Sequence, residues 1–264
     1  MTPPGTPPAG APGRAGEDGA RLVRGLLRSA RRAAAAGEPL PGEHQLAREL
    51  GSSRPAVRRG LARLEAQGVL LRRQGAATLV DPTALEMLVR LEDQVEHVEV
   101  LERLGYRAEV ELLDSEEVPA PPALAAALGP RAGPRALRTL KRWRADGVAA
   151  MVAEDVLALP AGAEPGAVAA GTSVFAAAEQ LWGEPVVWEV AVPGAVVLDA
   201  TTAPLMEQGV GAPCLTLRMT GVAVSGLRLF TALEHHRTDL ATYALVRTVR
   251  PPWRAGTGRG APPG

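Results

Sequence analysis

One continuous stretch, residues 37–80, constrains the fold of this chain more than any other. Apolar residues recur at helical spacing over residues 43–50 and predict a first helix that ends at Gly51. Ser52 or Ser53 can begin a second helix, because a serine hydroxyl accepts a hydrogen bond from an unpaired amide of a helix's first turn. The sequence therefore predicts two helices joined by a short turn.

The second helix of this pair has one apolar stripe and one basic face. Its apolar residues recur at i, i+4 and i+7, and its arginines lie off that stripe. The apolar residues are Val57, Leu61 and Leu64, and the arginines are Arg58, Arg59 and Arg63. Gly68 ends the helix, and two short strands at 69–73 and 78–80 follow around a turn. This order predicts a winged helix-turn-helix, which inserts the start of its second helix into the major groove of double-stranded DNA.

Charge is distributed unevenly along a chain whose formal net charge is zero. Residues 21–80 contain twelve Arg and four Glu, a net charge of +8, whereas residues 81–264 contain sixteen basic and twenty-three acidic residues, a net charge of −7. A compact basic domain attracts the phosphates of nucleic acid. We therefore expect the first part of the chain to bind an operator in double-stranded DNA and the second part to have another role.

The same stretch resembles the DNA-binding domain of the GntR family of bacterial transcription factors. The matching residues are Leu40-Pro41-x-Glu43-x-x-Leu46-Ala47, Leu50-Gly51-x-Ser53-Arg54-x-x-Val57-Arg58, Leu61-x-x-Leu64-Glu65-x-x-Gly68 and Arg73-Gln74-Gly75. The resemblance implies DNA contacts from both helices and from the wing. With the neighbours of those positions included, the predicted DNA-binding residues are His44, Ser53, Arg54, Arg58, Arg72, Arg73, Gln74 and Gly75. His44 and Ala77 replace the family's usual arginine and glycine, so operator preference is expected to differ.

The remainder of the chain predicts an α+β domain around an antiparallel sheet. The apolar residues of 83–104 recur at nearly helical spacing, which predicts a linker that continues into a helix. Strand-like segments follow at about 107–118, 136–144, 149–159, 186–198, 214–224 and 227–237, with short helices at about 122–128, 174–182 and 202–208. Long strands mixed with short helices and Gly/Pro joints are typical of this fold class.

This second domain resembles UTRA, the effector-binding domain of the HutC subfamily, whose fold is like that of chorismate lyase. The matching residues are Pro119-Ala120-Pro121, Leu128-Gly129, Lys141-Arg142-Trp143-Arg144-Ala145-Asp146-Gly147, Thr172-Ser173-Val174-Phe175 and Arg237-x-Asp239. The resemblance implies a small polar or anionic effector, often a sugar phosphate, held by Arg142, Arg144 and Ser173 with an acidic partner at Glu154, or at Asp155 if the register is offset by one residue.

Strand geometry would let Arg142 and Arg144 bind one anion together. Residues at i and i+2 of a strand face the same side, while Trp143 between them faces the other. Each residue also has an ordinary explanation, since Ser173 can simply cap a helix and two arginines can lie on a solvated face. Phe230 and His236 stand where the family often has glutamate and tyrosine. A more apolar effector, or none, therefore remains open.

Several function classes are excluded by composition. The lone Cys214 cannot form an intramolecular disulfide, and no apolar run is long enough to cross a membrane, so we expect a cytoplasmic protein with no membrane partner. The four histidines (44, 97, 235, 236) assemble no recognisable metal site or catalytic triad, and 235 and 236 would face opposite ways on a strand. We predict no enzyme, no cofactor and no metal.

The predicted domains are a disordered tail (1–19), a winged helix-turn-helix (20–81), a linker (82–95), a UTRA-like effector-binding and dimerisation domain (96–250) and a second disordered tail (251–264). The predicted function is a homodimeric transcriptional regulator, a repressor whose operator binding is modulated by an effector. The alternative is a repressor whose second domain only dimerises. A lyase-like enzyme is a third reading, which would turn over a bound aromatic acid.

Overall fold

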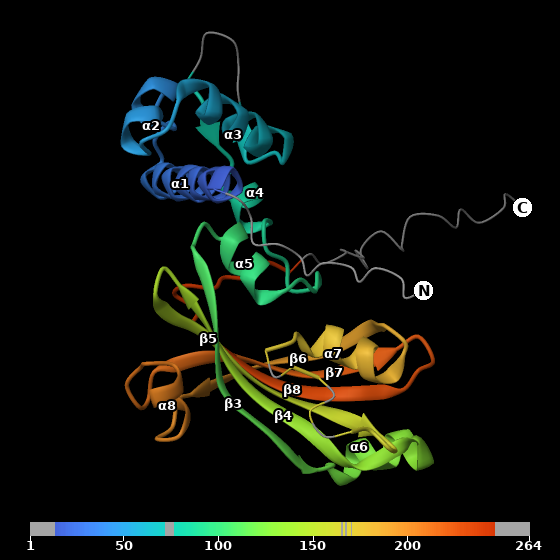
Figure 1. Cartoon of the computed structure of the whole chain (residues 1–264). Coiled ribbons are helices and arrows are strands. Elements are labelled where there is room, and N and C mark those ends of the chain that lie inside the picture. The colour runs from blue at the N-terminus through green and yellow to red at the C-terminus, as the bar shows by residue number, and fades with distance from the viewer. Residues whose placement is uncertain (1–13, 72–76, 165, 167, 170, 246–264) are drawn as a thin grey trace, which may run out of the picture.

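The chain folds into a helical N-terminal domain and a sheet-based C-terminal domain, which lie end to end in Figure 1. The structure is a computed structural model that describes residues 14–71, 77–164, 166, 168–169 and 171–245. None of the helices in these ranges is long and apolar enough to cross a membrane. The predicted combination of a winged helix with an antiparallel α+β domain is confirmed.

The N-terminal domain has three helices and a short antiparallel hairpin. They are α1 (Arg14–Ala36), α2 (Glu43–Glu49), α3 (Arg54–Ala66), β1 (Leu70–Leu71) and β2 (Leu79–Val80). Ser53, not Ser52, is the N-cap of α3, and its side chain accepts a hydrogen bond from the amide of Ala56 at 3.3 Å. Helix α1 begins at Arg14, whereas the sequence predicted a disordered segment to residue 19 and a helix from Arg21.

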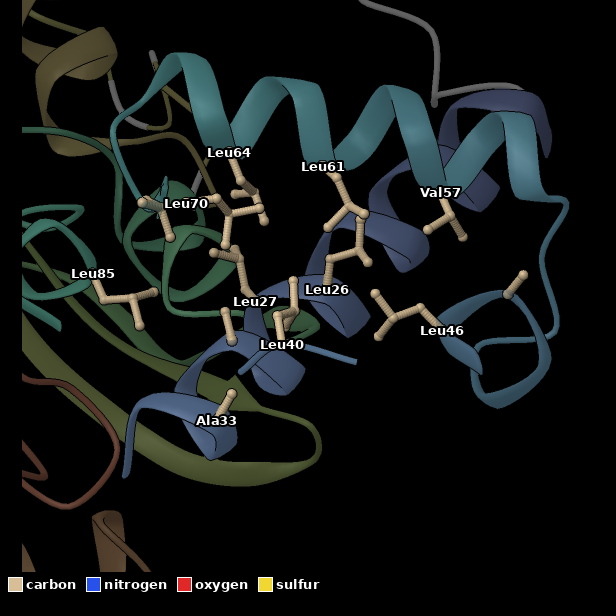
Figure 2. Close-up of a cluster of buried hydrophobic side chains, with 13 residues drawn as sticks. Leu26, Leu27, Ala33, Leu40, Leu46, Val57, Leu61, Leu64, Leu70 and Leu85 are labelled. Atoms are coloured by element: carbon tan, nitrogen blue, oxygen red, sulfur yellow. The ribbon is translucent and has the colours of Figure 1, made fainter. Parts of the chain in front are cut away.

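The apolar stripe of α3 packs onto α1 and forms the core of this domain. Leu26, Val57, Leu61 and Leu64 are buried, and Figure 2 shows them meeting between the two helices. The helices approach closely because Gly60 has no side chain, since a Cβ there would lie 2.5 Å from Cδ1 of Leu26. The arginines of α3 stay exposed outside this buried stripe. The amphipathic pattern therefore fixes which side of α3 faces solvent.

The connection between the domains consists of two short helices rather than the single helical region that the spacing suggested. Helix α4 (Pro82–Glu86) is capped by Asp81, and a non-helical segment separates it from α5 (His97–Arg103). Leu85 packs into the core of the N-terminal domain, whereas Val89 packs into the core of the C-terminal domain. The connection is therefore anchored at both ends.

The C-terminal domain is a six-stranded antiparallel sheet with the order β3-β4-β5-β8-β7-β6. The strands are β3 (Ala108–Pro119), β4 (Ala132–Ala145), β5 (Val148–Pro160), β6 (Val186–Val197), β7 (Pro213–Ala223) and β8 (Arg228–His236). The helices are α6 (Pro122–Leu128), the 3-10 turn η1 (Gly129–Arg131), α7 (Val174–Trp182) and α8 (Thr202–Leu205). The predicted strands and helices agree with these bounds to within a few residues.

The two faces of this sheet are covered differently. We call inner face the one that packs against α5, α6 and α7, and outer face the one on which α8 lies. Along β4, Thr139, Lys141 and Trp143 are buried in the inner face, while Arg142 and Arg144 belong to the outer face. This alternation decides the environment of every candidate effector-binding residue.

Truncation of the α3 stripe tests this packing. Leu61→Ala is expected to lower the free energy of unfolding of the N-terminal domain by about 2–5 kcal/mol, because it leaves a cavity between α1 and α3. Urea unfolding of the full chain followed by circular dichroism measures the loss. The matched control is Arg59→Ala on the exposed side of α3, with an expected change within about 0.5 kcal/mol. Equal losses in the two variants would contradict the packing described here.

Candidate functional site

The first candidate site is the exposed beginning of α3, with the side chains of α2 beside it. Arg54 is the first residue of α3, Arg58 lies one turn later, and both are exposed. His44 is exposed on α2, the helix that precedes α3 across the short turn. Arg54 and Arg58 flank the buried stripe of α3, and together with His44 they are exposed, so all three side chains are accessible to a DNA duplex. Ser53 is committed to the α3 cap through its side chain.

Arg58 is held by an ion pair that the sequence did not predict. Its Nε and Nη2 atoms donate to the carboxylate of Glu43 at 3.1 and 2.9 Å, in a two-pronged contact between α3 and α2. The carboxylate raises the pKa of Arg58, chiefly through the hydrogen bond. Glu43 therefore orients Arg58 and also competes with any anion that approaches it.

The wing is described only at its base. Leu70 pairs with Val80 and Leu71 with Leu79. Arg72, Arg73, Gln74 and Gly75, which the sequence assigned to DNA binding, lie outside the described residues. Their role stays a prediction.

Part of the positive charge of the N-terminal domain faces the C-terminal domain instead of a free surface. Nη1 of Arg28 donates to the carbonyl of Gly105 at 2.9 Å and lies 3.5 Å from Asp146. Arg24 forms an ion pair with Glu102 at 3.7 Å. The interpretation of the whole +8 charge as a phosphate-binding surface was therefore too broad, because α1 uses arginines to contact α5 and the β4–β5 turn.

Arg142 and Arg144 face the same side of the sheet and share the carboxylate of Glu111, whereas the sequence assigned them to an effector anion. On the outer face, Nη2 of Arg142 donates to Glu111 at 2.8 Å and Nε of Arg144 donates to the same oxygen at 3.3 Å. Nη1 of Arg144 also donates to Glu207, just beyond α8, at 2.9 Å. The charge of both guanidinium groups is already matched by this network.

Ser173 lies at the inner face, away from the two arginines. It is the N-cap residue of α7, yet its hydroxyl makes no capping bond and instead donates to Glu96 at 2.7 Å. Lys141 is the strand residue on its side of the sheet, and Nζ of Lys141 donates to the carbonyl of Thr172 at 2.8 Å. The structure therefore does not bring Arg142 and Arg144 together with Ser173.

The predicted acidic partner, Glu154 or Asp155, is also decided by which face of the sheet each residue occupies. Glu154 faces the outer side and accepts a hydrogen bond from Arg138 at 3.1 Å. Asp155 is buried at the inner face, 3.5 Å from Nζ of Lys141. Of the two alternatives that the sequence left open, Asp155 is the one that faces Ser173 and Lys141. Burial raises the pKa of Asp155 above its ordinary value.

A cluster of buried ionisable side chains, which the sequence did not reveal, occupies the inner face. Glu234 accepts a hydrogen bond from Nε2 of His97 at 2.8 Å and makes a second 2.8 Å hydrogen bond with Nε2 of His236. The hydroxyl of Tyr243 lies 2.8 Å from Nδ1 of His236. We call His97, Glu234 and His236 the inner triad. Spacing alone could not identify it, because position 97 is far from β8 in the sequence.

The inner triad lies in an acidic, poorly hydrated environment. Burial opposes ionisation of Glu234, but the two imidazoles offset it and hold the pKa of Glu234 well below its ordinary range. On β6, which β7 separates from β8, burial and the charges of Glu234 and Asp155 raise the pKa of Glu189 to about 7. The Oε2 atom of Glu189 is buried without a hydrogen-bond partner.

The free space around the inner triad is small. Two cavities of about 30 Å³ each lie beside His97 and Glu189, one toward the loop that precedes α5 and one toward α7. Space of this size admits one or two water molecules or an ion. An effector as large as a sugar phosphate fits there only after the helices on the inner face move apart.

Comparison with known proteins identifies both domains. Residues 103–240 match the family model described as "UTRA domain", and residues 22–80 match the one described as "Bacterial regulatory proteins, gntR family". The chain belongs to the gntR family of bacterial regulatory proteins. This GntR-family protein is 49% identical over 59 residues to the HTH-type transcriptional regulator Mce2R of Mycobacterium tuberculosis, a match over 21% of this chain and 25% of that protein. The chain aligns with only 17 to 25% of the length of the curated relatives that it matches.

Solved structures show the same architecture. PhnF from Mycobacterium smegmatis, at 22% identity, covers 80% of this chain and 92% of its own with a TM-score of 0.51. The effector domain of the same protein, at 21% identity, covers 58% of this chain and 95% of its own with a TM-score of 0.50. At these identities the similarity establishes the fold alone.

Substitutions of Arg58 and Glu43 test the first candidate site. If Arg58 meets a phosphate, Arg58→Ala should reduce the slope of log affinity against log salt by about one unit. If it reads a base, the slope should stay unchanged and one operator position should lose about 1–3 kcal/mol of discrimination. Glu43→Gln should tighten binding, since it removes the competing carboxylate. Fluorescence anisotropy with a duplex selected from a random library gives these values.

Arg138→Ala, on the outer face of the C-terminal sheet, is the matched control for Arg58→Ala. It removes a guanidinium that carries carboxylate partners but lies in the other domain. Identical effects of the two arginine substitutions would contradict the assignment of DNA contact to α3.

Proposed function

We propose that this GntR-family protein is a transcriptional repressor that binds a palindromic operator as a homodimer and releases it when a small polar effector binds at the inner face. The observation that carries the proposal is the capped, solvent-exposed start of α3 with Arg54 and Arg58 one turn apart. A helix start of this kind fits the major groove, where arginine can give two hydrogen bonds to guanine. The operator titration of Arg58→Ala tests this half of the proposal.

Dimerisation is supported by an apolar patch on the outer face of β6, one of the two edge strands of the sheet. The patch consists of Trp188, Val190 and Val192, whose exposed fractions are 72%, 57% and 47%. Exposed apolar groups gathered on one strand are typical of an interaction surface. We assign this patch to a second copy of the chain, because two half-sites of a palindrome require a two-fold pair of winged helices.

Effector control is supported by the position of α5 between the inner triad and α1. His97, the first residue of α5, contacts Glu234 of the sheet. Gly105, just beyond the other end of α5, accepts the hydrogen bond from Arg28 of α1. A ligand that displaces His97 would therefore shift the surface on which the DNA-binding domain rests. Such coupling requires that the ligand bind the two arrangements with different affinity.

The charges at the inner face bear on the chemical class of the effector. Four carboxylates, from Glu96, Asp155, Glu189 and Glu234, lie with one lysine and two imidazoles around the two cavities and the inner triad. This surplus of acidic groups favours a polar ligand with a cationic group over a bare anion. The proposal thus departs from the anionic effector that the resemblance implied.

A second candidate function is a repressor whose C-terminal domain only dimerises. The size of the inner-face cavities favours it, since each of the two cavities beside the inner triad, as lined by the described residues, has only about 30 Å³. The two candidates differ in one respect, which is whether any small molecule changes stability and operator binding together.

Thermal shift with a panel of polar metabolites separates the two candidates. A ligand present at one hundred times its dissociation constant should stabilise the C-terminal domain by about 2.7 kcal/mol. The same ligand should weaken operator binding in the anisotropy assay. A panel in which no compound does either supports the dimerisation-only function, and a ligand that stabilises the protein and tightens operator binding contradicts the proposed repressor mechanism.

A substitution in the apolar patch tests the dimer. Trp188→Glu should convert the dimer to a monomer, because it replaces the largest and most exposed apolar side chain of the proposed interface with a charge. Sedimentation velocity gives the mass in solution. The matched control is Val210→Glu, which replaces an equally exposed apolar side chain in the loop after α8 and should leave the dimer intact. A Trp188→Glu variant that remains dimeric would exclude this surface.

A further inference from the structure

We propose that the inner triad, His97, Glu234 and His236, is a binding site for a divalent transition-metal ion of the zinc class. Each residue offers a ligand atom, and the three atoms lie within 4.8 Å of one another. Two imidazole nitrogens and a carboxylate oxygen are ligands that zinc and similar ions accept. Metal binding is a property of this chain beyond its proposed regulatory function, and it does not depend on DNA binding.

The fold builds this arrangement from two separate segments. Glu234 and His236 occupy positions i and i+2 of β8, so both face inward, and His235 between them is the strand residue of the outer face. His97 reaches them from the first turn of α5, where its ring stacks on Trp143 with centroids 4.4 Å apart. Backbone and packing therefore hold the three donors before any ion arrives.

The distances permit an ion with only small side-chain movements. The carboxylate of Glu234 now lies between the two imidazoles, 2.8 Å from Nε2 of each. Bonds of about 2.0–2.2 Å from zinc to nitrogen or oxygen place neighbouring donors roughly 3.2–3.6 Å apart in a tetrahedral site. Small rotations of the imidazoles away from Glu234 would open this space.

Tyr243 orients one of the donors. Its hydroxyl bonds to Nδ1 of His236 at 2.8 Å, which leaves Nε2 directed at the centre of the triad. The second ring nitrogen of a metal-binding imidazole usually donates its N–H to an outer acceptor, and the Tyr243 oxygen is placed to accept it from Nδ1. Tyr243 is therefore a positioning residue in this proposal, not a ligand.

Glu189 supplies a second observation that points to a cation. Its Oε2 atom is buried without a hydrogen-bond partner, and the residue lines both cavities beside His97. An orphaned buried carboxylate oxygen carries a desolvation penalty that a nearby ion would offset. The cavities, about 30 Å³ each, have the size for an ion and a water molecule. That water would complete the coordination, with Glu189 as a nearby acidic group.

Direct metal binding to the full-length protein tests the proposal. Chelator-treated protein should take up one equivalent of Zn²⁺ per chain by isothermal titration. Co²⁺ should give the visible absorption of a four- or five-coordinate nitrogen and oxygen site without thiolate bands, because the single cysteine, Cys214, lies at the outer face. Absence of stoichiometric uptake by the wild-type chain would overturn the proposal.

Two adjacent histidines provide a matched pair of variants. His236→Ala should weaken metal binding by at least about tenfold, whereas His235→Ala, on the opposite face of the same strand, should leave it unchanged. Tyr243→Phe should weaken binding by roughly 10–100-fold, since it removes only the outer hydrogen bond. Unchanged affinity in His236→Ala would overturn the assignment.

A measurement on the wild-type protein keeps the test decisive if His236→Ala does not fold. Zinc X-ray absorption should show two imidazoles with oxygen donors and no sulfur. A spectrum with one imidazole or none would overturn the site, because the inner triad is the one group of three potential ligands that come this close in the described part of the chain.

Discussion

The alternation of side chains across β4, β5 and β8 is the constraint on which the C-terminal domain depends. Because successive residues of a strand face opposite sides, one face receives Arg142 and Arg144 and the other receives Lys141 and Asp155. The outer face pairs its arginines with acidic side chains of the same chain. The inner face gathers buried acids and imidazoles around small cavities. The strand register therefore places the paired charges on the outer face and the small cavities on the inner face.

Helix α5 connects that inner face to the DNA-binding domain. Its first residue, His97, contacts the sheet, and the turn after its last residue contacts α1 through Arg28 and Gly105. Gly105 has a φ of +94°, and a Cβ there would lie 3.3 Å from Cβ of Leu27, so α1 approaches this turn where a side chain would interfere. The contact gives a physical route by which events at the sheet can reach the winged helix.

Most of the fold could be predicted from local patterns. The stripe of Val57, Leu61 and Leu64 defines α3, and alternating apolar residues separated by glycine and proline define the strands of the sheet. The environments of the candidate effector-binding residues could not be predicted in the same way, because a motif places residues on a strand without fixing which face meets the helices. A shift of one residue moves every side chain to the other face. The Arg58–Glu43 pair was also unforeseen, since its partners are on different helices.

The sequence by itself determined the helix-turn-helix pair, the basic character of the N-terminal domain and the family to which the chain belongs, because these are carried by residues close together along the chain. Only the tertiary structure decided that Asp155 and not Glu154 faces Ser173, and that His97 meets Glu234 and His236. Those contacts join segments far apart in sequence. They follow from strand pairing and from the docking of α5 on the sheet, which no local pattern encodes.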